Sequence, residues 1–140
     1  MSSIPKRIRA QVWAEAGHRC EYCRTSSRLI GMPLIIDHII PKSLGGSDER
    51  ENLAASCYRC NEFKGGKNDD IDPETSQLVP LFNPRLQMWG EHFAWANNGS
   101  HIIGLTPTGR ATVVALRLNN DYAVAARIMW ISKDWHPPEV

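Results

Sequence analysis

The sequence has no long apolar run, no surplus of one charge and few cysteines. Its 140 residues carry 16 Lys and Arg against 15 Asp and Glu, so the formal net charge is only +1. No apolar run approaches the ~20 residues that a membrane span needs. The N-terminal residues 1–7 are basic without an apolar stretch after them, which is not the pattern of a secretory signal. These absences predict a cytoplasmic protein with no membrane partner.

The four cysteines form two pairs with the same spacing, Cys20-x-x-Cys23 and Cys57-x-x-Cys60. A cytosolic protein keeps its thiols reduced, which favours a bound metal over disulfides, although a redox role for the pairs stays open. Four thiolates suit a structural zinc ion. The 33 residues between Cys23 and Cys57 exceed the ~15–20 of a simple zinc ribbon. We therefore expect a further folded element between the pairs.

The segment between the pairs contains a short isoleucine-rich run at residues 34–40, which predicts a strand. Asp37 and His38 are neighbours in this run, so their side chains leave the strand on opposite faces. Pro41 ends the strand because it has no amide proton to donate. A carboxylate suits a hard ion such as magnesium or manganese, whereas zinc accepts thiolates. The sequence therefore predicts one structural metal and a second that takes part in chemistry.

A glycine-rich loop at residues 43–48 follows the predicted strand, and residues 49–53 lead the chain back to the second cysteine pair. We expect that pair to open a short helix with Asn61 in its first turn. Gly65-Gly66 would end this helix, because glycine is favoured just beyond a helix C-terminus.

These motifs occur in one order: the first cysteine pair, Asp37-His38-Ile39-Ile40-Pro41, Gly45-Gly46, Asn52-Leu53, and the second pair followed by Asn61-x-x-Lys64-Gly65. The order resembles that of the HNH endonucleases of the ββα-metal group. The resemblance covers roughly residues 18–68. It implies an α+β fold with a ββα-metal core and four-cysteine zinc knuckles.

The resemblance also implies a role for each matching residue. His38 would be the general base that activates a water for attack on a DNA phosphate. Asp37 would bind the divalent ion that stabilises the charge on the phosphate and on the leaving 3′ oxygen. Asn52 would orient His38 or fix the loop. The ligands of the structural zinc would be Cys20, Cys23, Cys57 and Cys60, and the phosphate contacts would be Arg59, Lys64 and Lys67.

Asn61 departs from the family pattern, in which a histidine binds the catalytic ion opposite the aspartate. The motif here is H-N-N rather than H-N-H. An asparagine carbonyl is a hard-metal ligand and a poor zinc ligand, so the predicted catalytic ion is Mg²⁺ or Mn²⁺. The same replacement supports an alternative hypothesis, in which the chain is a catalytically decayed, zinc-stabilised nucleic-acid-binding or interaction module.

The charge is unevenly distributed along the chain. Residues 1–67 carry 11 Lys and Arg against 7 Asp and Glu, a net +4, whereas residues 68–140 carry 5 against 8, a net −3. The basic character lies with the predicted nuclease core, as binding to a phosphate backbone requires. Nothing resembles a base-reading module, so we expect weakly sequence-specific binding to double-stranded DNA. A homodimer or a partner protein stays open.

We expect one domain over residues 1–140, with a structural extension at residues 69–140. The acidic residues 68–74 predict a solvated connector. An Asn-Gly turn between the alternating residues 92–95 and 101–105 predicts a β-hairpin.

Two helices are predicted to follow the hairpin. Thr106 is a favourable N-cap before Pro107, and the last helix runs from Tyr122 to about Asp134. The tail motifs at residues 82–85 and 104–112 resemble the C-terminal portion of small bacterial HNH proteins, many of them cyanobacterial. Four of the five tryptophans lie in this half, and large aromatics bury ~150–250 Å² each. They predict a core-completing role, with His92 as a further candidate for the ligand that Asn61 does not supply.

Overall fold

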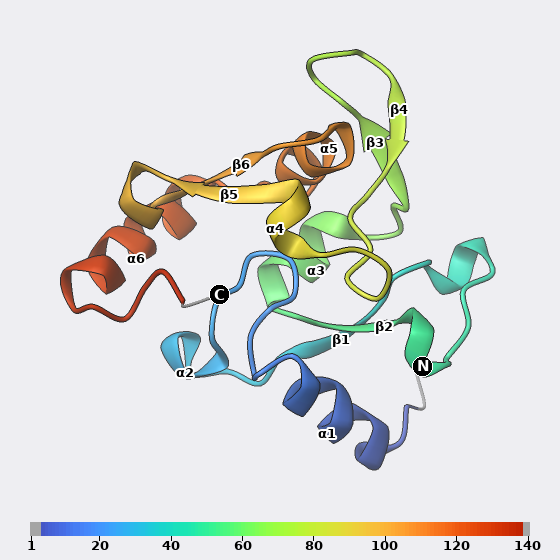
Figure 1. Cartoon of the computed structure of the whole chain (residues 1–140). Coiled ribbons are helices and arrows are strands. Elements are labelled where there is room, and N and C mark those ends of the chain that lie inside the picture. Colours follow the sequence, from blue (N-terminus) through green and yellow to red (C-terminus); the bar gives the residue numbers. More distant parts are fainter. Residues whose placement is uncertain (1–3, 139–140) are drawn as a thin grey trace. The chain divides into compact units, whose positions relative to one another are not determined.

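The computed structural model describes residues 4–138 (Figure 1). The first three residues of the basic N-terminal segment and residues 139–140 lie outside this range. The chain forms two compact units: unit 1 is made of residues 1–68 and 83–87, and unit 2 of residues 69–82 and 88–140. Each described sheet is a pair of antiparallel strands, and helices surround these pairs in sequence. This architecture confirms the predicted α+β class. Among the described residues, no helix combines the length and the apolar character of a membrane span.

In unit 1 two antiparallel strands and a following helix form the ββα element. Asp37 lies opposite Ala54 in the strand register, and His38 lies opposite Leu53. The predicted strand and helix are both confirmed. The elements are α1 (Lys6–Glu15), α2 (Ser27–Ile30), β1 (Ile35–His38), η1 (Lys42–Leu44), η2 (Arg50–Asn52), β2 (Leu53–Ser56) and α3 (Tyr58–Lys64).

Helix α3 begins at the second cysteine pair, as predicted. Cys57 is its N-cap, and the Cys57 Sγ accepts a hydrogen bond from the amide of Cys60 at 3.4 Å. Gly65 ends the helix with a positive φ of 53°, a backbone conformation that favours glycine. Asn61 is the fourth residue of α3 and therefore faces back over the helix N-terminus, toward β1.

Unit 2 contains two hairpins and two longer helices. The predicted hairpin, the N-cap at Thr106 and the last helix are confirmed; the Thr106 Oγ1 accepts a hydrogen bond from the amide of Gly109 at 3.0 Å. The elements are β3 (Asp69–Ile71), β4 (Leu78–Pro80), α4 (Trp89–His92), β5 (Phe93–Ala96), η3 (Asn97–Gly99), β6 (His101–Gly104), α5 (Pro107–Ala115) and α6 (Asp121–Ser132).

The acidic segment 68–74 is mostly exposed, as its composition predicts, but it is more than a connector. It contains β3, which pairs with β4, and Asp72 at the end of β3 is completely buried. The Asp72 carboxylate accepts two hydrogen bonds from the Arg110 guanidinium, at 2.9 and 3.0 Å. This bidentate pair lowers the pKa of Asp72 well below its usual value. Arg110 belongs to the tail motif at residues 104–112, so that motif has a structural function in unit 2.

Some aromatic side chains of unit 2 pack together, as the core-completing role predicts, whereas Trp135 is 58% exposed and lies outside the core. Phe82 and Phe93 make an edge-to-face contact with ring centroids 5.1 Å apart, and Trp89 stacks at a tilt on Trp95 at 5.3 Å. The His92 Nδ1 lies 2.6 Å from the Thr106 Oγ1, the N-cap of α5. His92 therefore links the end of α4 to the N-cap of α5, and its role as a metal ligand stays a prediction.

Candidate active site and metal centre

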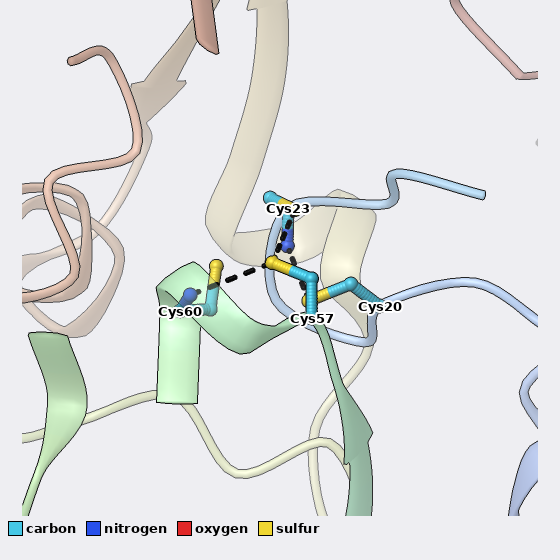
Figure 2. Close-up of side chains that lie close together, drawn as sticks. All are labelled: Cys20, Cys23, Cys57 and Cys60. Atoms are coloured by element: carbon cyan, nitrogen blue, oxygen red, sulfur yellow. Dashed lines mark hydrogen bonds between the residues drawn. The ribbon is translucent and has the colours of Figure 1, made fainter. Parts of the chain in front are cut away.

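The four cysteines converge on one point in unit 1. Figure 2 shows Cys20 and Cys23 on the loop after α1, facing Cys57 and Cys60 at the start of α3. All four are buried and none is in a disulfide, and their sulfur atoms lie within 4.8 Å of one another. The four cysteines that the sequence predicts as zinc ligands therefore lie together at one position.

The geometry of this cluster fits a tetrahedral zinc ion. With Zn–S bonds of about 2.3 Å, two sulfurs of a tetrahedron lie ~3.8 Å apart, and the Sγ atoms of Cys23 and Cys57 are 3.7 Å apart. Backbone amides at both pairs point at sulfur, from Cys23 to Cys20 at 3.5 Å and from Cys60 to Cys57 at 3.4 Å. Such N–H···S contacts stabilise thiolates.

The segment that carries the first cysteine pair is hydrogen-bonded to strand β2. The amide of Glu21 donates to the Ala55 carbonyl at 2.9 Å, and the amide of Ala55 donates back to the Glu21 Oε2 at 2.8 Å. Arg85, from the tail motif at residues 82–85, forms an ion pair with the other oxygen of the Glu21 carboxylate. Burial raises the pKa of Glu21, and the amide of Ala55 and the Arg85 guanidinium oppose that rise. The first cysteine pair is thus hydrogen-bonded directly to the strand pair.

Asp37 is buried on the face of β1 that α3 covers, with only 4% of its surface exposed. The Tyr22 hydroxyl donates to the Asp37 Oδ2 at 2.6 Å, and the Asn61 Nδ2 lies 3.3 Å from the Oδ1. Burial raises the pKa of Asp37 above its usual value, and the Lys64 ammonium and the Tyr22 hydroxyl oppose that rise. Desolvation also raises the pKa of Tyr22 well above its ordinary value, with the Asp37 charge as a second cause, so the hydroxyl is protonated and acts as a donor.

Lys64 is also buried, with an exposed fraction of 1%. Its Nζ donates to the carbonyls of His38 and Ile39, at 3.1 and 3.0 Å, and lies 3.2 Å from the Asp37 Oδ2. This placement differs from the phosphate contact that the sequence predicts for Lys64. Because acceptors from β1 and from the residue after it surround the ammonium, Lys64 neutralises the buried carboxylate and holds α3 against β1.

His38 leaves β1 on the opposite face from Asp37, as the strand periodicity predicts. Its Nε2 lies 2.7 Å from the Asp48 Oδ1, and the Lys42 Nζ lies 3.2 Å from the same oxygen. The His38 side chain is 14% exposed, and that of Asp48 is 43% exposed. The hydrogen bonds from His38 and Lys42 lower the pKa of Asp48. An ionised Asp48 accepts a hydrogen bond from the Nε2–H of His38, which leaves Nδ1 of a neutral ring as the proton acceptor.

Asn52 closes the loop that carries Asp48. Its Oδ1 accepts from the amide of Ile40 at 2.7 Å, and its Nδ2 donates to the carbonyls of Ile40 and Ser47, at 3.0 and 2.8 Å. A Cβ on Gly46 would lie 1.7 Å from the Ile40 carbonyl oxygen, which explains the glycine at this position. Of the two roles expected for Asn52, these contacts match loop fixation.

The comparisons with known proteins agree with this geometry. Residues 20–67 match the family model of the HNH endonuclease. They form an HNH domain. An alignment over 66 residues, which covers 43% of the chain, is 35% identical to the CRISPR-associated endonuclease Cas9 of Corynebacterium diphtheriae. The match spans 6% of the length of that relative. No solved structure matches the chain significantly.

The HNH domain has a donor set that fits a hard divalent ion at Asp37, on the face of β1 that α3 covers. Asp37 and Asn61 converge from β1 and α3 with 3.3 Å between the Oδ1 and the Nδ2. Half a turn of the amide exchanges its nitrogen and oxygen, so Asn61 can present a carbonyl oxygen to an ion bound by Asp37. Carboxylate and carboxamide oxygens are ligands that magnesium and manganese accept.

The remaining predicted cations of the HNH domain lie on α3 and just beyond it. Arg59 and Lys67 are exposed, in contrast to Lys64. Sequence reasoning missed two groups that contact the site: Tyr22, inside the first cysteine pair, and Asp48, in the glycine-rich loop. Asp48 follows Gly45-Gly46 and lies ten positions after His38, and no local pattern pairs the two residues.

Proposed function

We propose that the chain is a divalent-metal-dependent endonuclease that hydrolyses DNA phosphodiester bonds, with zinc in the four-cysteine site. One observation supports this most directly: adjacent residues of β1 present a hard-ion ligand on one face and an oriented imidazole on the other. Asp37 and Asn61 would hold magnesium or manganese. When bound, that ion supplies positive charge for the phosphate and for the leaving 3′ oxygen.

His38 is the general base in this proposal. The hydrogen bond from Nε2 to Asp48 leaves Nδ1 free to take a proton from a water molecule. The resulting hydroxide attacks the phosphorus atom, and the bond to the 3′ oxygen breaks, which leaves a 5′ phosphate. The imidazolium formed in this step is stabilised by the Asp48 carboxylate. Arg59 and Lys67 would contact the DNA backbone, in the part of the sequence that carries the net charge of +4.

Zinc-loaded protein is expected to convert supercoiled plasmid to open-circle or linear DNA when Mg²⁺ or Mn²⁺ is added. Omission of these ions is the correct control, because a strong chelator would also remove zinc from the cysteines. Agarose gels of a time course, with zinc content measured in parallel, check the result. Protein that keeps its zinc and binds DNA but cuts with neither ion would contradict the nuclease and favour the decayed-module hypothesis.

Asp48→Asn is expected to slow cleavage roughly tenfold, because the amide holds the His38 ring less firmly and does not stabilise its charged form. The loss should stay well below the ~10⁴-fold seen in a buried Asp–His pair, since Asp48 is 43% exposed. Single-turnover cleavage rates at saturating Mn²⁺ measure the effect. Glu49→Gln removes the same charge from the neighbouring exposed position, and equal rates for the two variants would assign the loss to charge alone.

A further inference from the structure

Tyr22 links the cysteine site to the proposed catalytic-ion site. It stands between Cys20 and Cys23, its side chain is completely buried, and its hydroxyl lies 2.6 Å from the Asp37 Oδ2. Glu21, its neighbour, is fixed to Ala55 of β2. Tyr22 therefore lies in a short segment bounded by Cys20 and Cys23. The positions of these two thiolates determine where its hydroxyl lies.

The other contacts of Asp37 come from the second cysteine pair. Asn61 directly follows Cys60, and Lys64 lies one helical turn after Cys60 on the same face of α3. Every side chain that the described contacts place on the Asp37 carboxylate thus belongs to a cysteine pair or to the helix that such a pair begins.

The two oxygens of Asp37 have different surroundings. Oδ2 accepts the short bond from Tyr22 and lies 3.2 Å from the Lys64 Nζ. Oδ1 makes only longer contacts, at 3.3 Å to Asn61 and 3.4 Å to Lys64. The strong donor on Oδ2 therefore sets the rotation of the carboxylate and directs Oδ1 toward Asn61, the second ligand of the proposed ion.

We propose that Tyr22 is a positioning residue for Asp37, through which the four-cysteine site sets the affinity for the catalytic divalent ion. This inference rests on the proposed function, because it requires Asp37 to bind that ion. Groups that hydrogen-bond a metal ligand from behind commonly change metal affinity or activity by about 10–100-fold when they are replaced. The zinc-bound knuckle thus has a second function beyond stability.

Tyr22→Phe is the test, because it removes one hydroxyl and keeps the ring in the core. Binding of Mn²⁺ to zinc-loaded protein is measured without DNA, from the electron paramagnetic resonance signal of free Mn²⁺. We expect about tenfold or greater weakening of Mn²⁺ binding, with zinc content equal to wild type. In cleavage assays the half-saturating Mn²⁺ concentration should rise by the same factor, and the rate should recover at high Mn²⁺.

Tyr58→Phe is the matched control, since it removes a tyrosine hydroxyl from a 57% exposed position on α3. Unchanged Mn²⁺ binding by Tyr22→Phe would overturn the inference while leaving the nuclease proposal intact. Loss of zinc by this variant would also overturn it, because Tyr22 would then serve the cysteine site. Equal Mn²⁺ binding by wild type and Asp37→Asn would instead remove the proposed ion site, and the inference with it.

Discussion

His38→Ala is expected to lower the rate of plasmid cleavage by about 10²–10⁴-fold, the usual contribution of a general base. The variant keeps Asp37 and Asn61, so Mn²⁺ binding should be unchanged, and zinc content should match wild type. The loss should appear in the single-turnover rate at saturating Mn²⁺. Added imidazole should restore part of the rate, because alanine leaves space where the ring accepted the proton.

The control for this prediction is His18→Asn. His18 is exposed and has a positive φ of 56°, a backbone conformation that asparagine tolerates. The His18→Asn variant should cut plasmid at the wild-type rate. A His38→Ala protein that also cuts at the wild-type rate would show that the base is another group, and the Asp48 contact would then be structural only.

Most of the HNH domain could be predicted from the sequence because its signals are local. The isoleucine run gave β1, the alternation across Asp37 and His38 gave their opposite faces, and the spacing of Cys57 and Cys60 gave the start of α3. In unit 2 the Asn-Gly turn likewise predicted the hairpin, and the Thr106 N-cap predicted the start of α5. Each of these features is decided by residues within a few positions of one another.

The features that sequence reasoning missed depend on distant partners. A lysine one turn after Cys60 has the same local pattern whether it faces solvent or a strand, and only the position of β1 buries Lys64. Asp72 looks like a solvated acid until Arg110, 38 residues later, is placed beside it. Tyr22 and Asp37 are 15 residues apart, and no periodicity connects them. A buried charge needs a nearby counter-charge, but a sequence does not say which one.

Removal of the structural metal is expected to have the largest effect on stability. Zinc binding by small cysteine sites contributes about 10–16 kcal/mol of apparent free energy in zinc-finger peptides, which is comparable to the ~5–15 kcal/mol by which a typical domain is stable. Loss of zinc should destabilise unit 1 first. In this unit Cys57 also caps α3, and the first cysteine pair is hydrogen-bonded to β2. Cys57→Ser should therefore lose zinc, and amide protons in β1, β2 and α3 should exchange rapidly with solvent.

Hydrogen exchange measured by mass spectrometry tests this segment by segment. Wild type stripped of zinc should show the same loss of protection and regain it when zinc is restored, whereas Cys57→Ser should not recover. The amides of α5 and α6 should change less, because their caps and the Asp72–Arg110 pair lie within unit 2. Protons compete with zinc for the thiolate ligands, so zinc should be released as the pH falls. Full protection of β1 and α3 in zinc-free protein would mean that the ββα element folds without the metal, and Tyr22 would then be positioned by packing alone.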